Sequence, residues 1–191
     1  MNCYAEADTA RTEAPDLVIV ATGGIPDTDW FEGSELCDSA WDVLTGTVPG
    51  KSDVLVYDGA GRQAAASCAL RLAGQGSSVC IATPDDALAI EMSYIDKSSF
   101  RKRFAELGIR SFVDVRLEKV ERRGNALPAT FRNELTGAES QVEAGQVVVE
   151  YGTLPAAPAP GRFLLHRIGD AVSSRDLYSA IYEAYRLCSK L

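Results

Sequence analysis

The sequence predicts an α/β protein with a Rossmann-like, three-layer fold, in which a central parallel sheet carries a small antiparallel β insert. The first observation is a strand–turn–helix–strand pattern at residues 54–83, VLVYDGAGRQAAASCALRLAGQGSSVCIAT. The second is a pair of continuous apolar runs, after Asp16 and after Gln146, which are typical of parallel strands covered on both faces. The third is the period-two alternation of residues 112–121, which indicates antiparallel strands.

The composition limits the classes of function. The 191 residues suffice for one domain or two small ones, and a net charge of −8 argues against sequence-independent binding of nucleic acid. No apolar run approaches the ~20 residues that a membrane span requires. The N-terminus is acidic and lacks the apolar stretch of a signal peptide. We therefore expect a cytoplasmic protein with neither nucleic acid nor membrane as a partner.

The cysteines and the single histidine form no metal or catalytic motif. The five cysteines are an odd number without metal-ligand spacing, so neither a metal ion nor an iron–sulfur cluster is expected in this chain. Cys68 and Cys80 fall in apolar helix and strand patterns and are expected to be buried thiols. His166 follows two leucines in a strand-like run, where packed histidines are commoner than catalytic ones. No residue is assigned a catalytic role.

The expected elements follow from apolar runs and turn residues. A strand after Asp16 ends at Gly23-Gly24, and a connection with a short helix at 39–44 follows. A strand at 54–57 then leads into a helix at 62–73. The elements expected after these are a strand at 79–82, a short helix from Thr83, a helix at 98–107, antiparallel strands within 111–143, a strand from Gln146, and a last helix capped by Ser173 and Asp176.

The turn after residues 54–57 has the glycine pattern of a dinucleotide-binding βα turn. Gly59, Gly61 and Ala64 fit a G-x-G-x-x-A spacing, in which glycines let the backbone approach a pyrophosphate and the helix start offers free N–H groups. In this register Asp58 lengthens the strand by one residue. In the other register Asp58 takes the first glycine position, where its carboxylate repels a phosphate. Arg62, at the helix start, is placed to meet a phosphate.

The ligand of this turn is left open by the sequence. The acidic residue that binds an adenosine ribose about 20 positions after the turn is replaced by Thr83, and no arginine stands there for a 2′-phosphate. A nucleotide site and a purely structural βαβ unit are both compatible with the pattern. If the turn binds a nucleotide, Gly61→Val should abolish binding with the fold nearly intact, and Asp58→Gly should strengthen it.

Two further segments, IVATGG at 19–24 and HRIGDAV at 166–172, flank this unit at opposite ends of the chain. Together with it they resemble the C-terminal FAD/NAD(P)-binding region of the flavin oxidoreductases built on an old-yellow-enzyme barrel. That family includes trimethylamine dehydrogenase, histamine dehydrogenase, 2,4-dienoyl-CoA reductase and N-methylproline demethylase-like members.

The resemblance implies a division of the chain. Residues 1–45 would be the tail of a FAD-type domain and a connection, and residues 46–153 an inserted NAD(P)-type Rossmann domain. Residues 154–161, LPAAPAPG, would be a Pro/Ala linker, and residues 162–191 the returning strand and helix of the FAD-type domain.

The resemblance also implies binding residues. Asp170 matches the aspartate that accepts a hydrogen bond from the flavin ribityl chain, and Gly169 allows close approach. Thr22 and Gly23 match the turn on the adenine-nucleotide side, while the turn at 59–64 would hold NAD(P) or an adenine nucleotide. For Asp170, capping of a helix start is the alternative role.

The implied partner is the remainder of a parent flavoenzyme, whose barrel carries FMN and the substrate. Neither the barrel, nor a Cys-rich cluster segment, nor the first βαβ unit expected before Asp16 is present, so we expect a fragment. It would be an accessory dinucleotide-binding or docking domain of an oxidoreductase that does not catalyse alone. The alternative is a non-catalytic α/β scaffold with a degenerate nucleotide site. The parent's substrate, the choice among NAD(P), ADP and FAD, and formation of a homodimer are left open.

Overall fold

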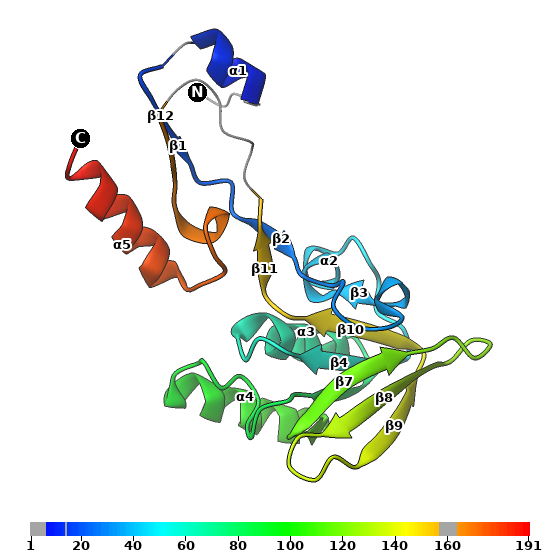
Figure 1. Ribbon diagram of the computed structural model, residues 1–191. Coiled ribbons are helices and arrows are strands. Elements are labelled where there is room, and N and C mark those ends of the chain that lie inside the picture. The colour runs from blue at the N-terminus through cyan, green and yellow to red at the C-terminus, as the bar shows by residue number, and fades with distance from the viewer. Residues whose placement is uncertain (1–6, 14, 157–163) are drawn as a thin grey trace. The chain divides into compact units, whose positions relative to one another are not determined.

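The fold divides into two units in the computed structural model, which describes residues 7–13, 15–156 and 164–191. Unit 1 comprises Met1–Ile25 with Thr153–Leu191, and unit 2 comprises Pro26–Gly152 (Figure 1). Cys3 and residues 157–161 of the expected linker lie outside the described residues.

The residues 26–45, which include the expected connection, lie in unit 2. The strand β3 (Asp38–Ser39) hydrogen-bonds in parallel to β10 (Gln146–Glu150), so it closes one edge of the unit 2 sheet. The helix α2 (Ala40–Thr45) buries Ala40 and Val43 in the same core. Edge pairing and apolar burial together tie this connection to the second unit.

Unit 2 is built on the predicted central parallel sheet, which has five strands in the order β3-β10-β4-β5-β6. Between β4 and β5 lies α3, whose alanine-rich face packs on the sheet, and α4 follows β5. The helix α4 starts earlier than expected because the Ser93 hydroxyl caps it by accepting the Asp96 N–H. The bounds are β4 Asp53–Asp58, α3 Gln63–Gly74, β5 Ser78–Ala82, α4 Tyr94–Leu107 and β6 Arg110–Phe112.

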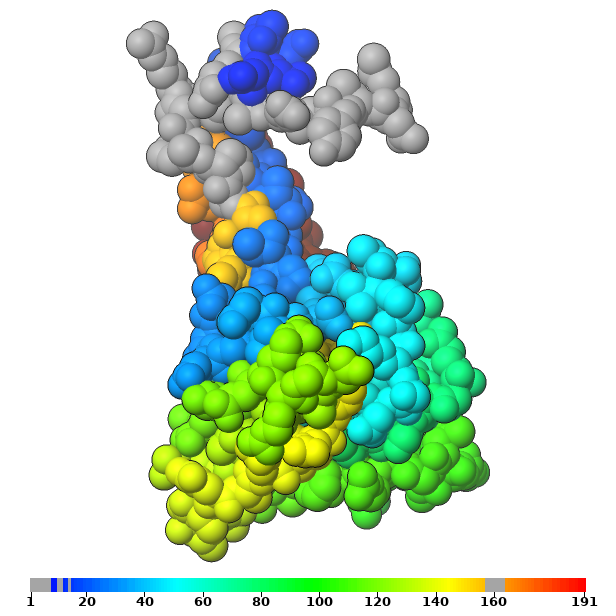
Figure 2. Space-filling model, turned by 90° about the vertical axis from the view of Figure 1, so that its right-hand side faces the viewer, coloured from blue at the N-terminus to red at the C-terminus, as the bar shows by residue number. Residues whose placement is uncertain are grey.

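The antiparallel insert forms the third layer. Its strands are β7 (Val115–Val120), β8 (Leu127–Asn133) and β9 (Glu139–Ala144), paired in that order. Phe131 and Leu117 pack there against Leu55 and Tyr57 of β4, on the sheet face opposite α3. Figure 2 shows this insert as the green to yellow surface of unit 2. The three-layer α/β fold class is therefore confirmed.

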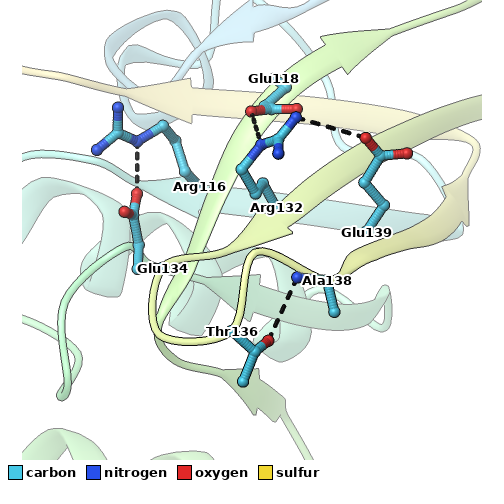
Figure 3. A network of polar contacts seen from close by, with 7 residues as sticks. All are labelled: Arg116, Glu118, Arg132, Glu134, Thr136, Ala138 and Glu139. Atoms are coloured by element: carbon cyan, nitrogen blue, oxygen red, sulfur yellow. Dashed lines mark hydrogen bonds and ion pairs between the residues drawn. The ribbon is translucent and has the colours of Figure 1, made fainter.

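The outer face of the insert carries a ladder of charges (Figure 3). Arg132 of β8 reaches Glu118 on β7 and Glu139 on β9, and Arg116 pairs with Glu134. These side chains are substantially exposed to solvent, so each pair contributes little to stability and mainly fits opposite charges across strands. The 3₁₀ helix η1 (Ser34–Leu36) contacts β7.

Unit 1 is smaller. The strands β1 (Leu17–Val20) and β12 (Leu164–Arg167) pair in parallel, and β2 (Gly24–Pro26) pairs with β11 (Thr153–Pro155). The chain then passes through the 3₁₀ helix η2 (Gly169–Ala171) into α5 (Leu177–Cys188). Of the expected pair Ser173 and Asp176, it is Asp176 that caps α5, by accepting the Ser179 N–H at 2.7 Å. The short helix α1 (Ala7–Glu13) completes the described part of the unit.

Candidate nucleotide-binding turns

The glycine turn of unit 2 follows a strand that extends through Asp58, as in the first of the two registers. Asp58 has no exposed surface. Its carboxylate accepts the Gly61 N–H through Oδ1 at 2.9 Å and the Ala89 N–H through Oδ2 at 3.1 Å. The amide that a phosphate-binding turn presents to its ligand is therefore already bonded inside the protein.

The segment 85–91 lies over this turn. Glu91 donates its backbone N–H to the Gly61 carbonyl at 2.9 Å, and a Cβ placed on Gly61 would lie 2.6 Å from Ile90 Cγ2. The sequence predicted a short helix from Thr83, but residues 84–92 form turns instead. Ala89 adopts a positive φ of 52°, a conformation that ends any helical run.

The crowding at Gly61 corrects the expectation for Gly61→Val. Gly61 has φ +65°, where a side chain is strained, and its Cβ position meets both Ile90 and Asp85. Substitution at this residue must disturb the fold itself. At the first glycine, Gly59, an added Cβ would lie 2.1 Å from the Tyr151 ring.

Acidic groups surround the turn. Burial is the largest of the effects that raise the pKa of Asp58 to about 6; the nearby Glu150 and Asp85 also raise this pKa, while the two backbone hydrogen bonds lower it. Glu150 is the register partner of Asp58 on β10, and burial also raises its pKa. One oxygen of Glu150, Oε1, accepts the Gly152 N–H, while Oε2 is buried without a hydrogen-bond partner among the described residues. The positive charge of Arg62 opposes the shift at Glu150.

The other residues predicted for this turn are Arg62, Ala64 and Thr83. Arg62 is the N-cap residue of α3 but makes no side-chain capping bond, and Ala64 lies in the first turn of that helix. Thr83 is buried, and its hydroxyl accepts the Asp85 N–H at 3.3 Å. This bond holds the backbone at the first residue of the segment 85–91, which covers the turn.

The predicted residues of unit 1 lie at the carboxyl ends of paired strands. β1 and β12 run in parallel, and Ile168 donates to the Val20 carbonyl at 3.0 Å. Thr22 and Gly23 follow one strand, and Gly169 and Asp170 follow the other. The structure thus brings together at one strand-pair end the two segments that the sequence analysis linked.

Both turns of unit 1 are ordered by local bonds. The Asp170 carboxylate accepts the Arg175 N–H at 3.2 Å and the Thr153 hydroxyl at 3.3 Å. The Gly169 N–H donates to Glu183 Oε2 on α5 at 2.8 Å, and Arg175 pairs with the same carboxylate. Gly23 has φ +73°, and no atom of the described residues lies within 4 Å of a Cβ placed on it. Among the described residues, no atom crowds the Cβ position of Gly23, whereas Ile90 and Asp85 crowd that of Gly61.

Four residues that shape these turns were not singled out from the sequence. Glu150 carried a usable signal, because it ends an apolar strand and carboxyl ends of parallel strands share one sheet edge. Ala89, Ile90 and Glu183 carried none, since their roles come from tertiary packing. Within the described ranges, no group of three or more His, Cys, Asp or Glu side chains could hold a metal ion. The described helices include none long and apolar enough to cross a membrane.

Comparison with known proteins places the chain in a family. The chain is 36% identical over 218 residues to the probable N-methylproline demethylase of Rhizobium meliloti, covering 97% of this chain and 32% of that protein. It is 35% identical over 223 residues to the multifunctional alkene reductase/demethylase OYE of Caballeronia cordobensis, covering 100% and 33%. A solved 2-naphthoyl-CoA reductase complex matches with a TM-score of 0.83 and 25% identity, covering 98% of this chain and 28% of that one. No family model matches the chain.

These matches define the chain first as a Rossmann-like region of flavin-dependent oxidoreductases. It belongs, more particularly, to the trimethylamine dehydrogenase and old-yellow-enzyme family, which confirms the resemblance drawn from the sequence. The chain spans about a third of the length of these curated relatives.

Proposed function

We propose that this chain is an accessory region of a flavin-dependent oxidoreductase, in which unit 1 completes an FAD- or ADP-type site and unit 2 serves as a scaffold. The chain binds and orients but does not catalyse alone. One observation supports this proposal: the described residues of unit 1 leave apolar side chains exposed and bring two strand-end turns together.

The uncovered surface lies mainly on α5. None of its residues is buried, and Leu177, Tyr178 and Tyr185 are each more than 70% exposed. The paired strands β1 and β12 also expose Ile19 and Leu164. Parallel strands are normally covered on both faces, and contiguous exposed apolar residues mark a surface that another part of a protein covers. We infer that preceding parts of the parent flavoenzyme pack here.

The unit 1 turns fit an adenine-nucleotide or flavin group. Gly23 leaves space for close approach, and Asp170 is held in place yet is only partly buried. In this role Asp170 accepts a hydrogen bond from a ribityl or ribose hydroxyl, while Gly169 and Thr22–Gly23 let the backbone approach. The bound group would supply redox or positioning chemistry of its own, and the protein supplies orientation.

An exchange experiment tests this proposal. This chain replaces the matching third of the Rhizobium meliloti relative, and the purified chimera is denatured so that released FMN, FAD and ADP can be quantified by chromatography. We expect an adenine nucleotide or FAD beside FMN, and Asp170→Asn should reduce its occupancy. The control, Asp42→Asn on the exposed side of α2, should leave occupancy unchanged. A folded chimera that releases FMN alone would contradict the proposal.

A second candidate is NAD(P) or adenine-nucleotide binding at Gly59–Gly61, favoured by the strand–turn–helix geometry and the positive φ of Gly61. The Asp58 carboxylate and the covering segment oppose it. Titration of the isolated chain with NAD, NADP, ADP and FAD in a thermal-shift assay separates the candidates. A stabilisation by NAD or NADP would favour this second site, and no response to any of them favours a scaffold with a degenerate site.

A further inference from the structure

We infer that the Asp58 carboxylate is an internal substitute for a dinucleotide phosphate, and that residues 85–91 are a built-in cover that keeps the unit 2 turn closed to dinucleotides. This inference goes beyond the proposed function, which rests on unit 1. In this inference, a side chain of the protein itself occupies a turn that has the glycine spacing of a nucleotide site.

The first step concerns the donors. In a phosphate-binding βα turn, anionic oxygens accept backbone N–H groups at the glycines and the helix start. Here an anionic oxygen of Asp58 takes the Gly61 N–H at 2.9 Å from three residues earlier in the chain. The second oxygen takes the Ala89 N–H at 3.1 Å, so one carboxylate joins the turn to its cover.

The second step concerns the cover, which is held from three sides. On the turn, Glu91 donates to the Gly61 carbonyl and Ile90 contacts Gly61. Toward α4, Lys97 Nζ donates to the Ile90 carbonyl at 3.3 Å. Toward the connection of β6 and β7, Asp114 donates its N–H to the Asp85 carbonyl at 2.9 Å. A segment fixed at both ends and at its centre is part of the fold.

The third step concerns charge. The groups that face Asp58 are Glu150 from β10, which is 5% exposed, and Asp85 from the cover. Arg62, at the start of α3, acts on Glu150. A phosphate entering this turn would meet the carboxyl groups of Asp58 and Glu150, which are buried, so repulsion between like charges there is weakly screened. The packing of residues 85–91 over the turn and the negative charge of the nearby carboxyl groups therefore both act against binding of a dinucleotide phosphate.

Nuclear magnetic resonance of the whole isotope-labelled chain tests the inference directly. We expect the Gly61 and Ala89 amide protons to exchange at least tenfold more slowly than that of Gly124, a turn glycine with no described atom near its Cβ position. We expect both resonances to shift together as the pH passes through about 6, where the Asp58 carboxyl group titrates. Millimolar NAD or ADP should leave both resonances in place. Fast exchange at Gly61, or a shift of its resonance with either nucleotide, would overturn the inference.

Variants provide the second measurement. Asp58→Gly with Ile90→Ala removes both the substitute anion and the side chain over Gly61, and should tighten NAD or ADP binding at least tenfold in calorimetric titration. The matched variant Asp86→Gly with Leu88→Ala alters the same loop away from the turn and should give no gain. Equal affinities for wild type and the first variant would overturn the inference. The proposed function is tested separately, by the nucleotide content of the chimera with and without Asp170→Asn.

Discussion

Substitution of Gly61 by alanine measures how firmly the cover is seated on the glycine turn. Two costs add at this residue. An alanine at φ +65° loses about 1–2 kcal/mol from backbone strain. The new Cβ would also lie 2.6 Å from Ile90 Cγ2, and overpacking of this kind typically costs about 1–3 kcal/mol. We expect the free energy of unfolding of unit 2 to fall by about 2–5 kcal/mol.

Gly108 offers a matched control. It ends α4 with φ +68°, close to that of Gly61, and no atom of the described residues lies within 4 Å of its Cβ position. Gly108→Ala should therefore lose only the backbone share, about 1–2 kcal/mol. Ile90→Ala added to Gly61→Ala should recover much of the steric share, which a double-mutant cycle reports as coupling between the two residues.

Urea unfolding followed by tryptophan fluorescence is a suitable assay. Both tryptophans, Trp30 and Trp41, belong to unit 2, so the signal reports that unit alone. Equal losses of unfolding free energy for Gly61→Ala and Gly108→Ala, with no coupling to Ile90, would refute the packing of residues 85–91 against Gly61.

Three further predictions concern stability and order. The pKa of Asp58 is raised to about 6 from 3.8, so the folded chain binds this proton more tightly than the unfolded chain; the group's stabilisation, about 3 kcal/mol, is complete below pH 4 and is lost as the pH rises through 6. Denaturation between pH 4 and 7 should show this loss, and Asp58→Asn should remove it. Gly33→Ala places a Cβ 1.8 Å from the Val120 carbonyl oxygen and should cost more stability than Gly124→Ala, measured by chemical denaturation. Glu183→Gln weakens the bond to the Gly169 N–H, so exchange of that amide should quicken while a distant amide in β4 keeps its rate.

Much of the fold could be predicted because the strands of unit 2 carry strong local signals. The four residues between the two aspartates of β4 are apolar or aromatic, α3 is rich in alanine on one face, and the insert alternates in β7. The assignment of residues 26–45 could not be predicted, since β3 has two residues and belongs to unit 2 only through its pairing with β10. Such a short strand has no periodicity of its own.

The candidate sites were predictable only in part. Spacing placed Gly59 and Gly61 at a strand–helix turn, and the two linked segments, which hold Thr22 and Asp170, follow strands that pair with each other. The state of the turn at Gly61 depends on Ala89 and Ile90, about thirty residues later, whose positions follow from tertiary contacts. A pattern of glycines records where the backbone must bend, but it does not record which group accepts the freed N–H.

The turns at Gly23 and Gly61 share one requirement of a nucleotide site, the backbone shape, but differ in another, the space around the glycine. A positive-φ glycine after a parallel strand occurs at both Gly23 and Gly61, so backbone shape alone does not distinguish them. What differs is what meets each glycine: described atoms leave the Cβ position of Gly23 free, whereas Ile90 and a carboxylate fill the surroundings of Gly61. A buried carboxylate bonded to two backbone amides is costly to displace, because both the donors and the charge would need new partners. We therefore expect the available N–H donors and the local charge at each turn, rather than the glycine spacing, to decide whether that turn binds a nucleotide.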